Sequence, residues 1–391
     1  MASTAYATYE QQTPPRATPA VGLAGFVRGC LDGMRSALEW VFGTLTLIVA
    51  LAIVATIPVV QLLSLGYLLE TSGRVAREAR LRDGFVGIRK AAQLGRIALG
   101  ITILMIPLWI AAFLRFRAQL IDPASRQVQG WSIAVGVIAA VVLFQIVTGC
   151  LRGARIRHFL IPRPIRSARL LARRDTYARA RDAVWDFAVG LRLPYYFWLG
   201  LRGFVGASLW LAVPISLLAV ASRLSPPAGG LVGLLGGALM AVALLYLPFV
   251  QARFAAENRL AAMFELKAIR RCFARAPLAF LVALALTLAL ALPLYLLKIE
   301  IVPREAAWLP SLLFVVSIFP ARLSTGWALA RASRRHAARR WWVRWPARLA
   351  MVPLVAFYVF LVYFTQYLSW YGVWSLYEQH AFLVPAPFLG Y

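Results

Sequence analysis

Residues that usually carry chemistry are scarce in this sequence. The 391 residues include 3 cysteines, 3 histidines and 15 acidic side chains. Cys30, Cys150 and Cys272 are odd in number, and their spacing matches no zinc-ligand pattern. Neither a disulfide framework nor a structural zinc site is therefore expected. We interpret the three cysteines as small apolar packing residues.

Motifs for catalysis are also missing. The histidines are isolated from one another, and no H-E-x-x-H, paired-aspartate or Walker-type pattern occurs. Glu257, Glu265, Glu300 and Glu305 each have Arg or Lys close by in sequence, which favours local ion pairs. We predict no catalytic residue, no metal ligand and no cofactor, and the sequence argues against an enzyme.

Long charge-free runs dominate what is present. Hydrophobic residues make up 61% of the chain and the mean hydropathy is +0.72, well beyond the roughly half-apolar usage of soluble domains. Most uncharged runs reach the roughly 20 residues that a helix needs to cross a bilayer, and the two shortest can span if flanking arginines snorkel. We predict an all-α polytopic transmembrane helical bundle of about eight segments, within the runs 40–69, 97–114, 127–151, 203–222, 224–252, 276–297, 306–321 and 349–377.

The positive charge alternates along these segments. Of the 42 Lys and Arg residues, 33 fall in alternate loops and 9 in the remaining loops and tails. Because Lys and Arg concentrate in cytoplasmic loops, we expect the first set to be cytoplasmic. This predicts a multi-pass membrane protein with the C-terminus outside the cytoplasm.

The run 40–69 leaves two alternatives open. It contains Pro58 in its second half, so it forms either one tilted, kinked helix or a hairpin of two short helices. The single helix puts the N-terminus outside, and the hairpin puts it inside. Three arginines in the tail do not decide between them.

Two regions flank or interrupt the predicted bundle. Residues 1–20 have the composition of a disordered tail without a secretory signal, and residues 21–391 form one membrane domain. The loop 152–202 mixes arginines with Leu170, Trp185 and Phe187, as basic interfacial helices do. We expect this loop to contact anionic lipid, not nucleic acid, through Arg166, Arg169, Arg173 and Arg174.

Small and aromatic residues suggest how the helices pack and sit in the bilayer. Gly229, Gly233 and Gly237 are four residues apart, which predicts a smooth face for close helix packing, within this chain or in an oligomer. Aromatic residues near segment ends are typical of membrane-interface anchors. The predicted anchors are Tyr67, Trp341, Trp342, Trp345, Trp370 and Trp374.

Short segments of the sequence recur. "SLGYLLETSGRVARE" from Ser64 aligns with "STGWALARASRRHAA" from Ser324, and "PVVQ" at Pro58 resembles "PFVQ" at Pro248. The unit would be a helix, a basic interfacial segment and a second helix. Duplicated units of this kind occur in transporters, although short apolar, arginine-rich matches also arise by chance.

Two longer segments suggest a family. "IPVVQLLSLGYLL" followed by a basic tract, and later "QARFAAENRLAAMFELKAIRRCFARAP", resemble a family of prokaryotic polytopic membrane proteins defined as a domain of unknown function. That family shares an N-terminal Pro…Gly-Tyr-Leu turn, and the resemblance covers residues 40–330. It implies the inner membrane of a prokaryote and the hairpin for residues 40–69, and it carries over no catalytic or binding residue. The loop 152–202 and the aromatic C-terminus depart from it.

Two functions remain compatible with the sequence. The first is a non-catalytic scaffold or accessory component that binds another membrane protein, because the charge-free runs hold no ionisable residue. The second is a transporter or lipid-handling protein, because prolines lie in several predicted helices. A solid bundle would favour the first function, and broken helices around a cavity would favour the second.

Overall fold

The computed structural model describes residues 23–153, 155–161, 165, 169–170, 173, 175–296, 308–369, 372–377 and 382–383. The predicted tail 1–20 lies outside these residues. Within them the secondary structure is helical throughout, and eight helical segments are long and apolar enough to cross a membrane. These segments belong to α1 (Leu23–Thr56), α3 (Ile88–Ile121), α4 (Arg126–Leu151), α7 (Asp175–Gly190) with α8 (Leu193–Ala221), α9 (Pro226–Glu257), α11 (Pro277–Leu296), α12 (Trp308–Ser333) and α13 (Trp341–Leu368). The predicted all-α polytopic bundle is confirmed.

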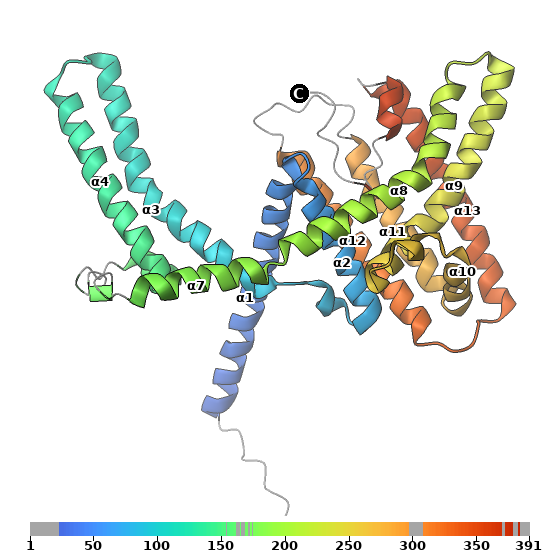
Figure 1. The fold of residues 1–391 in the computed structure, drawn as a ribbon, viewed down its shortest axis with the longest axis horizontal. Coiled ribbons are helices and arrows are strands. Elements are labelled where there is room, and N and C mark those ends of the chain that lie inside the picture. The colour runs from blue at the N-terminus through green and yellow to red at the C-terminus, as the bar shows by residue number, and fades with distance from the viewer. Residues whose placement is uncertain are drawn as a thin grey trace, which may run out of the picture.

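The run 40–69 forms a hairpin. Helix α1 ends at Thr56 and α2 (Gln61–Glu78) begins after a tight turn in which Val59 has a positive φ of 67°. The Ser64 hydroxyl donates a hydrogen bond to the Leu51 carbonyl (2.8 Å), so α2 runs back along α1. Pro58 lies in the turn, where it has no helical hydrogen bond to break. The N-terminal end of α1 and the C-terminal end of α2 therefore point to the same side (Figure 1).

Helix α2 is the inner helix of the bundle. It packs on α1, α8, α9 and α12, and its buried residues include the polar side chains of Gln61, Ser64, Glu70, Thr71 and Ser72. A helix enclosed by protein does not meet lipid, so its second half tolerates polar and charged groups that a lipid-facing helix excludes. This explains why α2 is not among the eight apolar segments.

Glycines set the distance between α2 and its neighbours. A Cβ on Gly66 would collide with the Tyr196 carbonyl oxygen of α8, and a Cβ on Gly200 would collide with the Leu62 carbonyl oxygen of α2. On α12, a Cβ on Gly326 would likewise collide with the Ser72 carbonyl oxygen. Small residues at helix crossings allow backbones to touch, which maximises packing contacts inside a membrane.

The end of α2 has the same backbone conformation as the end of α9. Ala79 (φ 59°, ψ 24°) and Asn258 (φ 54°, ψ 31°) are left-handed caps, each followed by an extended arginine and a 3-10 turn. The turns are η1 (Leu81–Gly84) and η2 (Leu260–Phe264). The sequences "EARL" and "ENRL" match there, and upstream Leu65, Tyr67, Leu68, Arg74 and Ala76 recur as Leu244, Tyr246, Leu247, Arg253 and Ala255.

This equivalence corrects the register of one predicted repeat. Pro58 begins the turn before α2, whereas Pro248 lies inside the continuous helix α9, so "PVVQ" and "PFVQ" are not equivalent in structure. The segments at Ser64 and Ser324 lie on α2 and α12, two helices that pack on each other. The unit of helix, left-handed cap, 3-10 turn and further helix occurs at α2–η1–α3 and at α9–η2–α10, where α10 is Leu266–Arg275.

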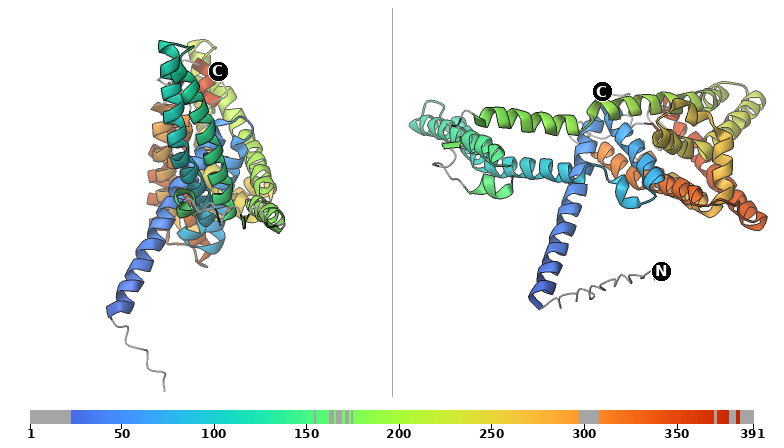
Figure 2. Two further views of the ribbon diagram at one scale, coloured as in Figure 1. Left: turned by 90° about the vertical axis from the view of Figure 1, so that its left-hand side faces the viewer. Right: turned by 60° about the horizontal axis from the view of Figure 1, so that its bottom comes forward.

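Helices α3 and α4 form an arm that projects from the bundle (Figures 1 and 2). The arm joins the bundle mainly through packing of α3 on α1. At its base, Phe159 of the short helix α5 (Ile156–Leu160) is 1% exposed and fills the space beside Gly100 of α3 and Gly149 of α4. Gln145 also donates to the carbonyls of His158 and Phe159, both at 3.0 Å. The arm is therefore internally packed.

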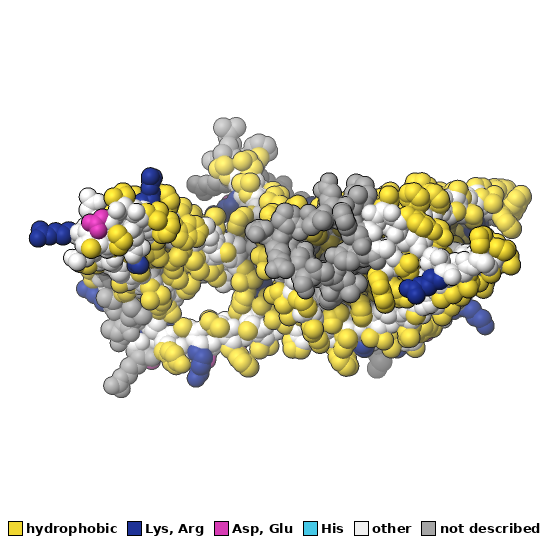
Figure 3. All heavy atoms as spheres, turned by 90° about the horizontal axis from the view of Figure 1, so that it is seen from above, with side chains coloured by type: hydrophobic (Ala, Val, Ile, Leu, Met, Phe, Trp, Pro, Cys, Tyr) yellow, Lys and Arg dark blue, Asp and Glu magenta, His cyan; other side chains and the backbone are white. Residues whose placement is uncertain are grey.

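The loop predicted to hold interfacial helices contains α7, which runs crosswise between the arm and the bundle (Figure 1). It exposes Tyr177, Val184, Trp185 and Val189, which suits a helix lying at a bilayer surface. Seen from above, hydrophobic side chains dominate both arm and bundle, and basic side chains are few (Figure 3). Such a surface belongs in lipid or against another membrane protein.

Candidate functional site

Glu70 is the buried acceptor at the centre of a polar cluster. It is 5% exposed on α2, and its Oε1 accepts from Arg74 Nε (3.2 Å) and Arg77 Nη2 (2.7 Å). Its Oε2 accepts from the Tyr195 hydroxyl of α8 (2.8 Å). Arg77 also donates to the Ala255 and Ala256 carbonyls in the last turn of α9. The cluster thus joins α2 to α8 through the Glu70 carboxylate and α2 to α9 through Arg77.

A second buried charge lies on α12. Arg322 is 2% exposed, and its Nη1 donates to Gln251 Oε1 of α9 at 2.7 Å. Gln251 in turn donates to the Phe382 carbonyl at 2.9 Å, which ties the end of the described chain to the bundle. An arginine within a membrane helix is costly unless it is paired, and such residues often mark function.

Both charges correct the expectation that the membrane segments hold no ionisable residue. The charge-free runs end at Leu69 and Ala321, one residue before Glu70 and Arg322, because they were delimited by charge. In the structure α2 and α12 continue through both positions. The two charges are tolerated because protein, not lipid, surrounds them.

Several arginines cap helix ends within the chain. Arg334 donates to the Ala79 carbonyl at the end of α2 (3.0 Å), and Arg335 donates to the Arg275 carbonyl at the end of α10 (3.4 Å). Arg202 bonds the Asn258 side chain at the end of α9 (2.6 Å). Helix C-termini carry unpaired carbonyls and partial negative charge, which basic side chains satisfy. Part of the positive charge is therefore structural.

The acidic residues near η2 are paired as expected from their arginine neighbours. Arg253 contacts Glu257 at 2.8 Å and Glu265 at 2.6 Å, and Arg259 also bonds both carboxylates. Glu300 and Glu305 lie outside the described residues. Across the described ranges, no group of three or more His, Cys, Asp or Glu residues is placed to hold a metal ion.

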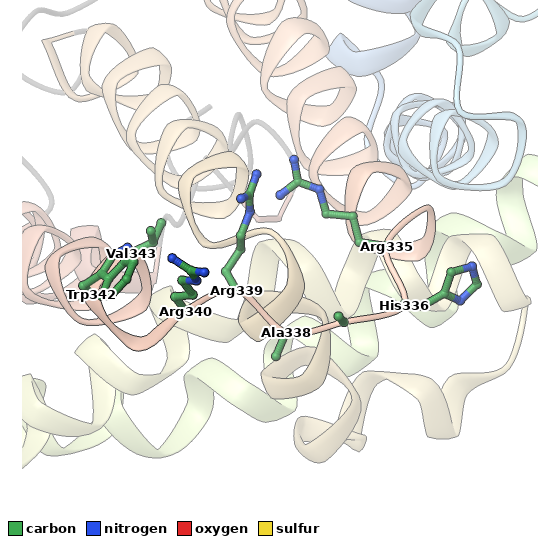
Figure 4. A pocket seen from close by; sticks show the side chains of 8 residues that line it. Arg335, His336, Ala338, Arg339, Arg340, Trp342 and Val343 are labelled. Atoms are coloured by element: carbon green, nitrogen blue, oxygen red, sulfur yellow. The ribbon is translucent and has the colours of Figure 1, made fainter.

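A basic pocket lies between α12 and α13. It has a volume of about 650 Å³ and is lined by residues 335–340 with Trp342 and Val343. The guanidinium groups of Arg335 and Arg339 point toward each other, and His336 points away (Figure 4). Arg340 stacks over the Trp342 ring at 4.8 Å from its centroid. No ion pair found among the described residues involves these three arginines.

The predicted glycine face borders a groove of about 710 Å³ between α8, α9 and α13. A Cβ on Gly229 would lie 2.6 Å from the Ala221 carbonyl oxygen, whereas those on Gly233 and Gly237 would have ordinary contacts of 3.5 and 3.6 Å. The closest packing of the middle of α9 on α8 instead occurs at Gly236, beside Leu217 and Leu218.

The predicted anchors are not all on the surface. Trp341, Trp342, Trp345 and Trp374 are exposed by 53–68%, whereas Trp370 lies outside the described residues. Tyr67 is 6% exposed, and its hydroxyl donates to the Val86 carbonyl at 2.9 Å. This burial corrects the expectation that the Tyr67 side chain reaches the headgroups.

The predicted lipid-contacting arginines are described only in part. Arg169 and Arg173 are exposed between α5 and α7, and Arg166 and Arg174 lie outside the described residues. Neither described arginine belongs to the Glu70 cluster or to the basic pocket. Their contact with anionic lipid stays a prediction.

One face of α4 is open although it carries a pattern for helix packing. Ser132, Gly136 and Ala140 recur every four residues and are exposed, and nothing lies within 4 Å of a Cβ built on Gly136. Beside them, Val137 and Val141 are exposed by 58% and 61%. Small residues at this spacing let another helix approach closely, and the described chain offers none there.

Comparison of the chain with protein-family models, curated protein sequences and solved structures gives no match.

Proposed function

We propose that this protein is a non-catalytic membrane scaffold whose α3–α4 arm binds a transmembrane helix of a partner protein. The open small-residue face of α4 carries the proposal. In a monomer of this shape, Gly136 gains nothing from lacking a side chain, since glycine lowers helix stability by roughly 1 kcal/mol relative to alanine. A partner backbone packed on Gly136 would use that missing side chain.

The bundle behind the arm suits a supporting role. Helices α8, α9, α11 and α12 continue through their internal prolines, and the α2 crossings bring backbones into contact. The arm is held by Phe159 and Gln145 at its base. A preformed arm loses little conformational entropy when a partner binds. We place the protein in a prokaryotic inner membrane with its basic loops in the cytoplasm and its C-terminus outside.

A transporter or lipid-handling function is the second candidate, and the buried Arg322 favours it. A cation inside the bundle could attract an anionic substrate. Its hydrogen bond to Gln251 is intramolecular, and the two hollows described above open at the surface and are not lined by Arg322. The scaffold function is therefore the better supported of the two.

Photo-crosslinking inside the native membrane tests the scaffold function. A photoreactive amino acid replaces Val137 on the open face of α4, and in a matched control it replaces Leu234, which is 73% exposed on α9. We expect the Val137 position to form a discrete protein adduct and the Leu234 position to form mainly lipid adducts. Lipid adducts alone at both positions would refute the scaffold proposal and favour the second candidate.

A further inference from the structure

We propose that the basic pocket between α12 and α13 binds the phosphate group of an anionic lipid headgroup. Its positive charge converges at one place on the surface, where Arg339 and Arg340 are exposed and Arg335 is partly buried. Arg335 and Arg339 turn their guanidinium groups toward each other, and Arg340 lies against Trp342 on the same wall (Figure 4). Like charges brought together without a carboxylate repel, and an anion between them removes the repulsion.

The environment of Arg335 favours the binding of an anion. The pKa of its guanidinium is lowered, because it is desolvated and because Arg339 and Arg331 carry the same charge. Neighbouring contacts fix the wall of the pocket: the Arg339 amide donates to the Ala274 carbonyl at 2.8 Å, and Arg335 donates to the Arg275 carbonyl at 3.4 Å. The loop that carries Arg335 and Arg339 is therefore held in place by its hydrogen bonds to the end of α10.

The start of α13 supplies further donors. Helix α13 begins at Trp341, and Trp342 and Val343 of its first turn line the pocket. The Val343 N–H donates to the Arg340 carbonyl at 3.1 Å. The N–H groups before it at the start of a helix carry partial positive charge, which favours phosphate. Arginine forks and helix amides together match the oxygen atoms of a phosphate group.

The location of the pocket selects a lipid over a soluble phosphate. Trp341, Trp342 and Trp345 surround the start of α13 and are exposed by 68%, 53% and 54%. Exposed tryptophans of a membrane helix sit at headgroup depth. A pocket bordered by them lies where lipid phosphates are, and its volume of about 650 Å³ admits a headgroup.

Native mass spectrometry of the purified protein, titrated with phosphatidylglycerol or phosphatidylcholine of equal chain length, tests this site. The variant Arg335→Gln/Arg339→Gln removes two charges, while the glutamine side-chain amides can still donate hydrogen bonds within the loop. Arg80→Gln/Arg82→Gln is the matched control, because it removes two exposed charges, one just before η1 and one within it. Arg335→Lys/Arg339→Lys keeps the charge and loses the guanidinium forks.

We expect the wild type to retain one phosphatidylglycerol and to prefer it over phosphatidylcholine. The affinity should fall about 30-fold in Arg335→Gln/Arg339→Gln, as for the loss of two interfacial charges, and partly recover with lysines. The η1 control should stay within about threefold. Equal retention by all variants would overturn the site. Arginine-dependent binding of inorganic phosphate without phosphatidylglycerol binding would overturn the lipid source and assign a soluble phosphate compound.

Discussion

Replacing Gly66 by leucine should abolish the folded bundle. Gly66 and Gly200 face each other where α2 crosses α8, and any Cβ on Gly66 meets the Tyr196 carbonyl. Overpacking usually costs about 1–3 kcal/mol when side chains can move aside. Here the obstacle is backbone, so α2 itself would have to leave α8. We expect little monodisperse protein after detergent extraction and a large drop in thermal stability of any that remains.

Gly136→Leu is the matched control for this prediction. Both substitutions place the same side chain on a helical glycine, but a Cβ on Gly136 has nothing within 4 Å. The Gly136 variant should therefore be extracted and melt like the wild type in detergent, since leucine is the better helix former. Equal stability of the Gly66 and Gly136 variants would show that α2 does not cross α8 at this close distance.

Replacing Glu70 by alanine should give the second large effect. The substitution leaves the Arg74, Arg77 and Tyr195 donors without their shared acceptor. Removing one partner of a buried ion pair costs about 3–5 kcal/mol, and the lower end applies because Arg74 and Arg77 are more than a third exposed. The melting temperature of the purified protein measures the loss, and Glu70→Gln, which keeps one acceptor oxygen, should lose less.

The control for the carboxylate is Asp182→Ala. Asp182 pairs with Arg181 at 2.9 Å on α7, but their side chains are 62% and 66% exposed. Exposed pairs contribute roughly 0–1 kcal/mol, so this variant should melt within experimental error of the wild type. A Glu70→Ala variant that is as stable as Asp182→Ala would show that the Glu70 cluster does not stabilise the fold.

Composition and charge spacing predict the class of this fold well, because lipid excludes charge from most of the helices. The same reasoning fails for the second halves of α2 and α12, which are surrounded by protein. Glu70 and Arg322 therefore escape a search for charge-free runs, and the first half of α2 is part of the run 40–69. Pro58 was the available signal for the hairpin, although it fits a kinked helix equally well.

The register of the structural repeat is hard to recognise in the sequence for a related reason. Short apolar sequences such as "PVVQ" recur readily in membrane helices. The residues at the polar C-terminal ends of the helices are the ones that share a backbone conformation. Ala79 and Asn258 share a left-handed cap, followed by Arg80 and Arg259 in extended conformation. The basic pocket could not be predicted from sequence, because arginine-rich loops are common here and only the fold turns Arg335 toward Arg339 (Figure 4).

The most direct test of the scaffold function is native mass spectrometry of the protein extracted gently from its own membrane. The wild type should leave with a second polypeptide in fixed stoichiometry. Gly136→Leu should lose that polypeptide, and Gly230→Leu, an equally open glycine on α9, should keep it. A wild-type protein that leaves the membrane alone, or a partner that Gly136→Leu does not displace, would contradict binding through the α4 face.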